Sequence, residues 1–149
     1  MKLKRMIATL FISLMMAFSV TSVAFAADMN VSEVSAEICT LINNERAEHG
    51  LNTLCWSDRL AQDASVRTDE VMINWSHTRP NGTDWYTLDP EYMYGEILAN
   101  QYTKATNVVQ AWLNSSAHKN VMLGNTYTQM GLAAKQNSDG CWYYTVEFY

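Results

Sequence analysis

The sequence is poor in basic residues. Its 149 residues include 10 lysines and arginines against 15 aspartates and glutamates, and the formal net charge is -5 at pH 7. A net negative chain is repelled by phosphate backbones and by anionic membrane surfaces. We therefore expect no nucleic-acid partner and no membrane binding through general electrostatics.

Sequence motifs that mark several large enzyme families are also missing. The chain contains no HExxH, no GxSxG, no P-loop and no GxGxxG. These motifs are typical of zinc proteases, serine hydrolases, phosphate-binding NTPases and dinucleotide-binding domains. Internal repeats and low-complexity tracts are absent as well. The function must therefore be inferred from scattered residues.

The first 26 residues have the pattern of a secretory signal peptide. Lys2, Lys4 and Arg5 precede an uncharged apolar stretch, and residues 24–26 read Ala-Phe-Ala, an A-x-A cleavage site. An uncleaved anchor is the alternative, because the apolar run approaches the ~20 residues that span a bilayer; the small-residue ending favours cleavage. We predict a signal peptide at residues 1–26, one domain at residues 27–149, and a secreted, extracellular protein without a stable membrane anchor.

Cysteine is scarce, and its three positions are Cys39, Cys55 and Cys141. None directly follows Ala26, so a lipid-anchored lipoprotein is not expected. No pair has the close spacing of zinc ligands. Export to an oxidising space predicts one disulfide and one remaining thiol, with all three pairings open. The alternative is three reduced, partly buried cysteines that act as small apolar residues.

Apolar residues at helical spacing predict three helices in the chain. The first runs from a cap at Asn30 to Gly50, and the second opens at Ser57 and ends before Trp75. The third covers residues 105–113, and residues 118–123 add one or two helical turns. The apolar stripe of the first helix is Val34, Ile38, Leu41 and Ile42. In the second helix the residues expected to face water are Arg59, Asp63, Arg67 and Glu70.

Strand-like segments are short and lie mostly at the end of the chain. Residues 95–99, 130–135 and 141–148 are predicted strands, and the Asp139-Gly140 turn between the last two predicts an antiparallel hairpin. In the final strand one face carries Trp142, Tyr144, Val146 and Phe148. Residues 78–94 form a long surface loop, in which Arg79 is expected to pair with an acid. This order of elements predicts an α+β fold with helices covering an antiparallel sheet.

Two histidines and one glutamate stand out as candidate functional residues. They are His77, which lies in the stretch SHTRPNG, Glu96 and His118. Each of them lies at the end of a predicted element. Two imidazoles and one carboxylate can hold zinc with one position open for water, or a non-haem iron. The same residues would equally make a polar pocket without a metal. Their spacing alone does not show that they converge.

Aromatic residues are concentrated around the predicted loop. Such rings stack on sugars or contact lipid at binding sites, but they also fill the core and the underside of loops in small domains. The second interpretation is favoured here. The residues are Trp75, Trp85, Tyr86, Tyr92, Tyr94 and Tyr102.

Five stretches of the chain together carry a family resemblance. They are LINNERAEHGLNTLCW (41–56), SHTRPNG (76–82), GEILA (95–99), AWLNSSAHKNVML (111–123) and YTQMGLAAK (127–135). In this order they resemble the bacterial branch of the CAP superfamily, also called SCP-like. That family includes cysteine-rich secretory proteins, insect venom antigen 5 and plant pathogenesis-related proteins. The resemblance implies a three-layer α-β-α sandwich around a small antiparallel sheet.

The resemblance also implies a cavity lined by two histidines and two glutamates. His77 takes the place of the first histidine, Glu96 that of one glutamate and His118 that of the second histidine. Ser115 stands where animal and plant members have the other glutamate, and Ile97 replaces the asparagine of the Gly-Glu-Asn stretch. Loss of a carboxylate removes an anionic ligand or general base. Both departures favour binding over catalysis.

Together these observations predict a secreted, monomeric extracellular binding module. Its cleft would be lined by His77, Glu96, His118 and Ser115, and its ligand would be a lipid, a cell-wall glycan or a protein. Family members include sterol or lipid binders and proteins with reported divalent-metal binding. The alternative is therefore a metal-dependent protease or esterase, with His77, His118 and Glu96 holding zinc or another divalent metal.

Overall fold

The computed structural model describes residues 30–149, and the predicted signal peptide at residues 1–26 lies outside them. Helix α1 (Val31–Glu48) follows the apolar pattern of the sequence, with Val34, Ile38 and Ile42 buried. The Asn30 side chain caps it by accepting a hydrogen bond from the amide of Ser32. Gly50, at φ 71°, ends it in the left-handed conformation that glycine adopts at little cost.

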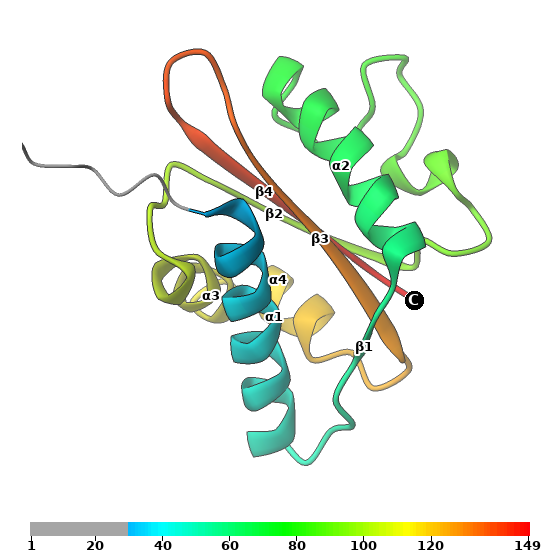
Figure 1. Ribbon diagram of the computed structural model, residues 1–149. Helices are drawn as coiled ribbons and strands as arrows, with labels where there is room; N and C mark the ends of the chain where they lie inside the picture. Colours follow the sequence, from blue (N-terminus) through cyan, green and yellow to red (C-terminus); the bar gives the residue numbers. More distant parts are fainter. Residues whose placement is uncertain (1–29) are drawn as a thin grey trace, which may run out of the picture.

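A four-stranded sheet with the order β1-β3-β4-β2 forms the middle of the molecule (Figure 1). Strands β2 (Gly95–Asn100), β3 (Gln129–Gln136) and β4 (Trp142–Phe148) pair antiparallel, as predicted. Strand β1 (Cys55–Trp56) pairs parallel with β3 and was not predicted. With only two residues, both exposed, it lacks the alternation that marks a strand in a sequence.

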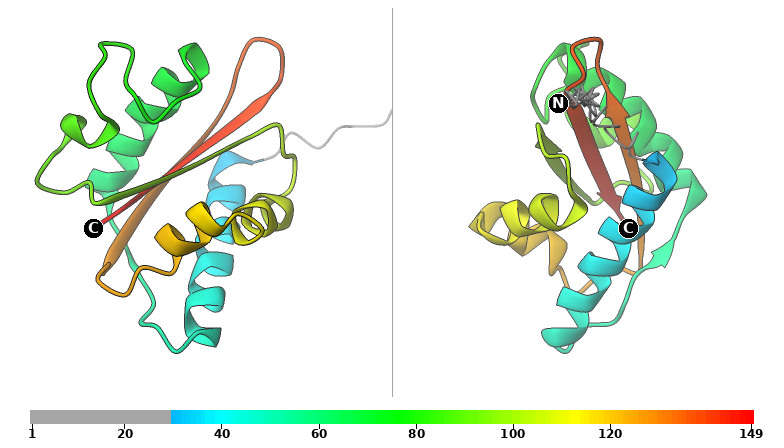
Figure 2. Two further views of the ribbon diagram at one scale, coloured as in Figure 1. Left: turned by 180° about the vertical axis from the view of Figure 1, so that it is seen from behind. Right: turned by 60° about the vertical axis from the view of Figure 1, so that its left-hand side comes forward.

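Helices cover both faces of this sheet and make three layers (Figures 1 and 2). Helices α1, α3 (Ala105–Leu113) and α4 (Ser116–Met122) lie on one side, and α2 (Asp58–Ile73) lies on the other. The main apolar core lies on the α1 side, where Tyr144, Val146 and Phe148 of β4 are fully buried. This confirms the α-β-α sandwich and the apolar face predicted for the last strand.

The second helix corrects one prediction. Leu60, Ala64 and Val71 are buried as expected, but Arg67 is fully buried against the sheet instead of facing water. Arg67 lies at the i+7 position from Leu60, which is on the apolar stripe itself. Helix α2 also comes very close to β3 at Gly131, where a Cβ atom would overlap the backbone at the start of the helix.

The loop between α2 and β2 contains a short 3-10 helix, η1 (Trp85–Leu88), and folds back against α2. Arg59 of α2 binds Asp89 through two hydrogen bonds of 2.5 and 2.8 Å, and its guanidinium lies 3.6 Å from the centre of the Tyr92 ring. Arg79 pairs with Glu70 of α2 at 2.7 Å, and not with an acid of the loop as predicted.

The predicted disulfide is not present among the described residues, where Cys39, Cys55 and Cys141 are all free. Cys55 pairs with one end of β3 at Gln129, whereas Cys141 precedes β4 beyond the other end, where Trp142 pairs with Gln136. Seven residues of strand span about 23 Å, far beyond the roughly 7 Å that a disulfide can bridge between Cα atoms. Cys39 lies on α1 in the wall of an apolar pocket, and burial raises the pKa of its thiol to about 11.

Candidate functional site

A buried ionic network lies between α2 and the sheet. Arg67 reaches Glu96 of β2 with Nε to Oε2 at 2.7 Å, and both side chains are shielded from solvent. The guanidinium also donates to Glu70 and to the main-chain oxygen of Ser76. Burial alone would raise the pKa of Glu96, but hydrogen bonds from His77 and Arg67 outweigh burial and hold it below its ordinary value. Glu96 is therefore ionised at neutral pH.

His77 lies at the surface end of this network. Its Nδ1 atom is 2.7 Å from Oε1 of Glu96, and half of its side chain, 49%, remains exposed. An ionised carboxylate only accepts hydrogen bonds, so Nδ1 must carry the proton. In the neutral imidazole the lone pair is then on Nε2, which is the free nitrogen. Glu96 thus fixes both the orientation and the tautomer of His77.

Glu147 is a site residue that the sequence reasoning missed. It lies directly opposite Glu96 across the β2–β4 pair and is completely buried. Within residues 30–149 neither of its carboxyl oxygens has a hydrogen-bond partner. Burial, reinforced by the negative charge of Glu96, raises the pKa of Glu147 well above its ordinary value. The two shifts have opposite directions, so as pH rises Glu96 loses its proton before Glu147 does, and Arg67 balances the charge of Glu96.

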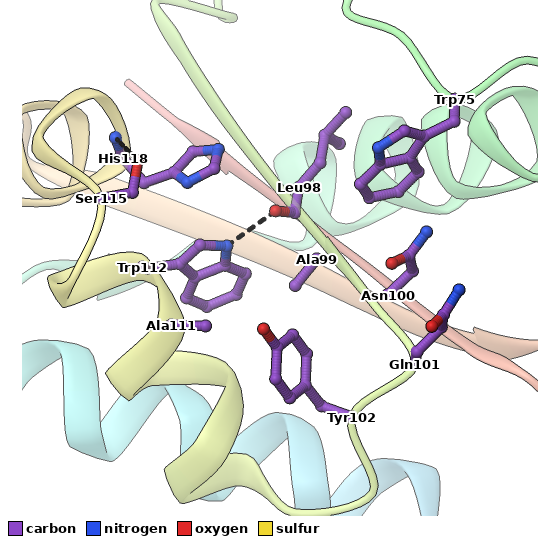
Figure 3. Close-up of a pocket in the computed structure, with 10 residues that line it drawn as sticks. All are labelled: Trp75, Leu98, Ala99, Asn100, Gln101, Tyr102, Ala111, Trp112, Ser115 and His118. Carbon is purple, nitrogen blue, oxygen red and sulfur yellow. Dashed lines mark hydrogen bonds between the residues drawn. The ribbon is translucent and has the colours of Figure 1, made fainter.

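A cleft of about 500 Å³ lies beside this network, along the last part of β2 (Figure 3). Residues from β2, α3, α4 and the segment that follows α2 contribute to its wall. The indole of Trp112 is buried and donates from Nε1 to the main-chain oxygen of Leu98 at 2.8 Å. The lining residues are Trp75, Leu98, Ala99, Asn100, Gln101, Tyr102, Ala111, Trp112, Ser115 and His118.

Two of the four predicted site residues line the cleft itself. His118 projects into it from α4, and Ser115 lies beside it at the start of the same helix (Figure 3). The Ser115 Oγ atom accepts a hydrogen bond from the amide of His118 at 3.5 Å and so caps the helix. Burial lowers the pKa of His118, and the nearby His77 lowers it further. At neutral pH His118 is an uncharged imidazole that can donate and accept hydrogen bonds.

His77 and Glu96 are not among the residues that form the wall of the cleft. The structure therefore brings the predicted residues into one region but divides them between two roles. His118 and Ser115 face the cleft, while Glu96 is engaged by Arg67 and His77. His77 is close enough to His118 to lower its pKa electrostatically.

These donor groups fit a divalent metal only in part. Within residues 30–149 no group of three or more His, Cys, Asp or Glu side chains is placed to hold a metal ion. Both oxygens of Glu96 are already bound, so direct contact with a metal would displace Arg67 or His77. The free Nε2 of His77, with a carboxylate behind the ring, is the arrangement found in metal-binding histidines. The donors that remain are His77 and His118.

The favoured interpretation predicted that the aromatic residues fill the core and the underside of loops, but several of them are exposed. Trp75, Tyr86, Tyr94 and Tyr102 are exposed, and Trp85 and Tyr92 are partly buried. Trp75 packs edge-on against Tyr143 at 5.9 Å and forms one side of the cleft. Tyr92 and Tyr94 both stack on Tyr149.

Comparison with known proteins identifies the family. The model of the family described as "CAP: Cysteine-rich secretory protein family" matches residues 39–148. The chain belongs to this family, as its resemblance had implied. None of the helices in residues 30–149 has the length and apolar character needed to cross a membrane.

Three relatives show how far the similarity extends. YlbC of Bacillus subtilis, described as an uncharacterized membrane protein, is 29% identical over 75% of this chain and 33% of its own length. An outer surface protein of Borrelia burgdorferi is 25% identical, with a TM-score of 0.71 over 80% of this chain and 94% of that one. An extracellular SCP-domain protein of Bacillus anthracis is 25% identical, with a TM-score of 0.63 over 78% of this chain and 40% of that one. The chain spans between 33% and 46% of the length of the curated relatives that it matches.

Proposed function

We propose that the protein is a secreted, extracellular binding module whose ligand occupies the cleft beside β2. The observation that carries this proposal is the state of Glu96: both of its oxygens are bound to Arg67 and His77. A general base must lie within reach of the substrate, whereas the Glu96 side chain is shielded from solvent and is not part of the cleft wall. The cleft wall instead presents aromatic rings, free amides and an uncharged His118, which are typical of a binding surface.

Ser115 supports binding over catalysis for a second reason. A nucleophilic serine needs a base within hydrogen-bond reach of its hydroxyl. In the structure the Ser115 hydroxyl oxygen caps α4, and within residues 30–149 it makes no hydrogen bond to the ring of His118. An extracellular location is supported by the similarity to the extracellular protein of Bacillus anthracis and to the outer surface protein of Borrelia burgdorferi.

The test is capture of the purified protein on three materials: bacterial cell wall, phosphatidylglycerol vesicles and an immobilised random peptide library. Ala111→Arg places a long side chain in the cleft without changing His118 or Ser115. Asn107→Arg, on the exposed side of the same helix, is the matched control because it adds the same charge outside the cleft. We expect wild type and Asn107→Arg to be retained on at least one material and Ala111→Arg to be lost from it. Equal retention of all three proteins would rule out the cleft as the binding site.

The metal-dependent hydrolase is a second candidate because Glu96 binds Nδ1 of His77 and leaves Nε2 free, as in metal-binding histidines. A structural neighbour of 13% identity, NaASP2, was solved with Zn²⁺ (TM-score 0.61, covering 81% of this chain and 82% of that one). Residues His77 and His118 would hold the ion, which would supply Lewis-acid chemistry when bound. Calorimetric titration of zinc into wild type, His77→Ala and His118→Ala tests this. Binding that either substitution abolishes would support it, and absence of binding to wild type would reject it.

A further inference from the structure

The cleft runs along an open edge of the sheet. Strand β2 is the last strand in the order β1-β3-β4-β2, so among residues 30–149 only β4 pairs with it. Successive residues of an edge strand point their main-chain groups alternately toward the neighbour and away from it. The amide of Gln101 donates to the oxygen of Trp142, next to β4, whereas the oxygen of Leu98 accepts from Trp112 on the opposite side. Leu98 and Asn100 therefore direct their main-chain groups away from β4 and into the cleft.

Three of these main-chain groups are left without a partner. Within residues 30–149 no hydrogen bond on the side away from β4 is made by the N–H of Leu98 or by the N–H and C=O of Asn100. Backbone groups on a sheet edge are strong hydrogen-bonding sites, and unpaired ones readily accept another strand. Leu98, Ala99 and Asn100 all line the cleft, so any ligand in it meets this edge (Figure 3).

We propose that the ligand of the cleft is an extended polypeptide segment that pairs with β2 as an additional strand. This inference rests on the proposed binding function and specifies its ligand class. The free groups of Leu98 and Asn100 are separated by two residues of strand, roughly 6.6–6.8 Å. An extended peptide repeats its own N–H and C=O groups at the same interval, and strand addition of this kind is an established mode of peptide recognition.

The side chains around the edge are arranged to contact such a peptide on both of its faces. Trp75 lies on one side of β2, and Trp112, Tyr102 and His118 lie on the other (Figure 3). Because side chains alternate along an extended chain, neighbouring residues of the peptide would contact opposite walls. Gln101 follows the strand with φ 67°, which turns the chain away from the strand direction and limits the paired stretch.

Other occupants fit these features less well. A lipid tail has no donors or acceptors for the three free main-chain groups. A second folded copy would have to bring its own edge strand to β2, yet Leu98 and Ala99 are only 5% exposed despite lying on the sheet edge. The edge is recessed between α3 and the segment that carries Trp75, so it admits a single chain more easily than a second sheet with its helices.

The experiment starts from 12-residue peptides selected from a random phage-displayed library on the purified protein. Selected peptides are resynthesised with single N-methyl groups along the backbone, which remove one donor each. We expect methylation of the one peptide residue whose N–H donates to the free oxygen of Asn100 to weaken binding at least tenfold, methylation of the residues directly before and after it to have little effect, and Ala111→Arg to abolish binding. Amide hydrogen exchange at Leu98 and Asn100 should slow in the complex, while Asn107→Arg binds as wild type does.

Two results would overturn the inference while leaving the cleft as a binding site. The first is a set of selected peptides whose affinity does not change with methylation at any position. The second is selection of no peptide at all, together with capture on cell wall or vesicles that Ala111→Arg abolishes. Slow exchange at Leu98 and Asn100 in a peptide-free dimer would assign the edge to a second copy and reject the peptide. Capture that Ala111→Arg leaves unchanged on every material would reject the binding function itself.

Discussion

Replacing Glu147 with glutamine should stabilise the folded protein by an amount that increases with pH. Glu147 is fully buried opposite Glu96, and its pKa in the folded state is raised well above the ordinary value near 4.5. In the unfolded chain the side chain loses its proton near pH 4.5, whereas in the folded protein it keeps the proton to higher pH. The free energy of unfolding therefore decreases as pH rises between the two pKa values.

The magnitude follows from the linkage between protonation and folding. Over the pH range in which only the folded state holds this proton, the unfolding free energy decreases by about 1.4 kcal/mol for each pH unit. Between pH 5 and pH 7 the wild type should lose about 2.8 kcal/mol from this group if its folded pKa exceeds 7. Glutamine has nearly the same shape as the protonated acid, but it does not titrate. The unfolding free energy of Glu147→Gln should therefore not show this decrease with pH.

Urea unfolding at pH 5, 6, 7 and 8 measures the difference directly. The unfolding free energy of Glu147→Gln minus that of wild type should be small at pH 5 and should grow with each step. Glu91→Gln, at an exposed position, controls for the loss of one acidic side chain. If the two proteins keep a constant difference over the whole range, Glu147 does not hold a proton in the folded state and the account of the carboxyl pair is wrong.

Three further changes test other parts of the structure. Glu96→Gln should cost about 3–5 kcal/mol in urea unfolding, because it removes the buried carboxylate of the Arg67–Glu96 pair and leaves the guanidinium with Glu70 as its carboxylate partner; a loss below about 1 kcal/mol would contradict the buried pair. Gly131→Ala should cost about 1–3 kcal/mol or more, because the added methyl group overlaps the backbone of α2, and an unchanged urea midpoint would refute this packing. Iodoacetamide at pH 8 should label the exposed Cys55 much faster than Cys39, whose pKa is about 11, and mass spectrometry without reductant should find no disulfide.

The sequence predicted the main elements because their signals are local. The alternation of Tyr144, Val146 and Phe148 identified a strand with one buried face, and the spacing of Ile38 and Ile42 identified a helix. Strand β1 gave no such signal, since two residues carry no period and its partner lies more than 70 residues away in the chain. The disulfide prediction failed for a related reason: Cys spacing does not show where three cysteines lie on the folded sheet.

The sequence by itself named four polar residues as candidates for the site, His77, Glu96, His118 and Ser115. Only the tertiary structure decided what each of them does. A charged group takes its role from the charges and the solvent around it, and here that environment comes from chain segments far apart in sequence. Arg67 and Glu147 meet Glu96 across α2 and β4, and they convert a candidate ligand into a buried support for His77. The open edge of β2 exists only because the sheet ends there, and no local sequence pattern could have shown it.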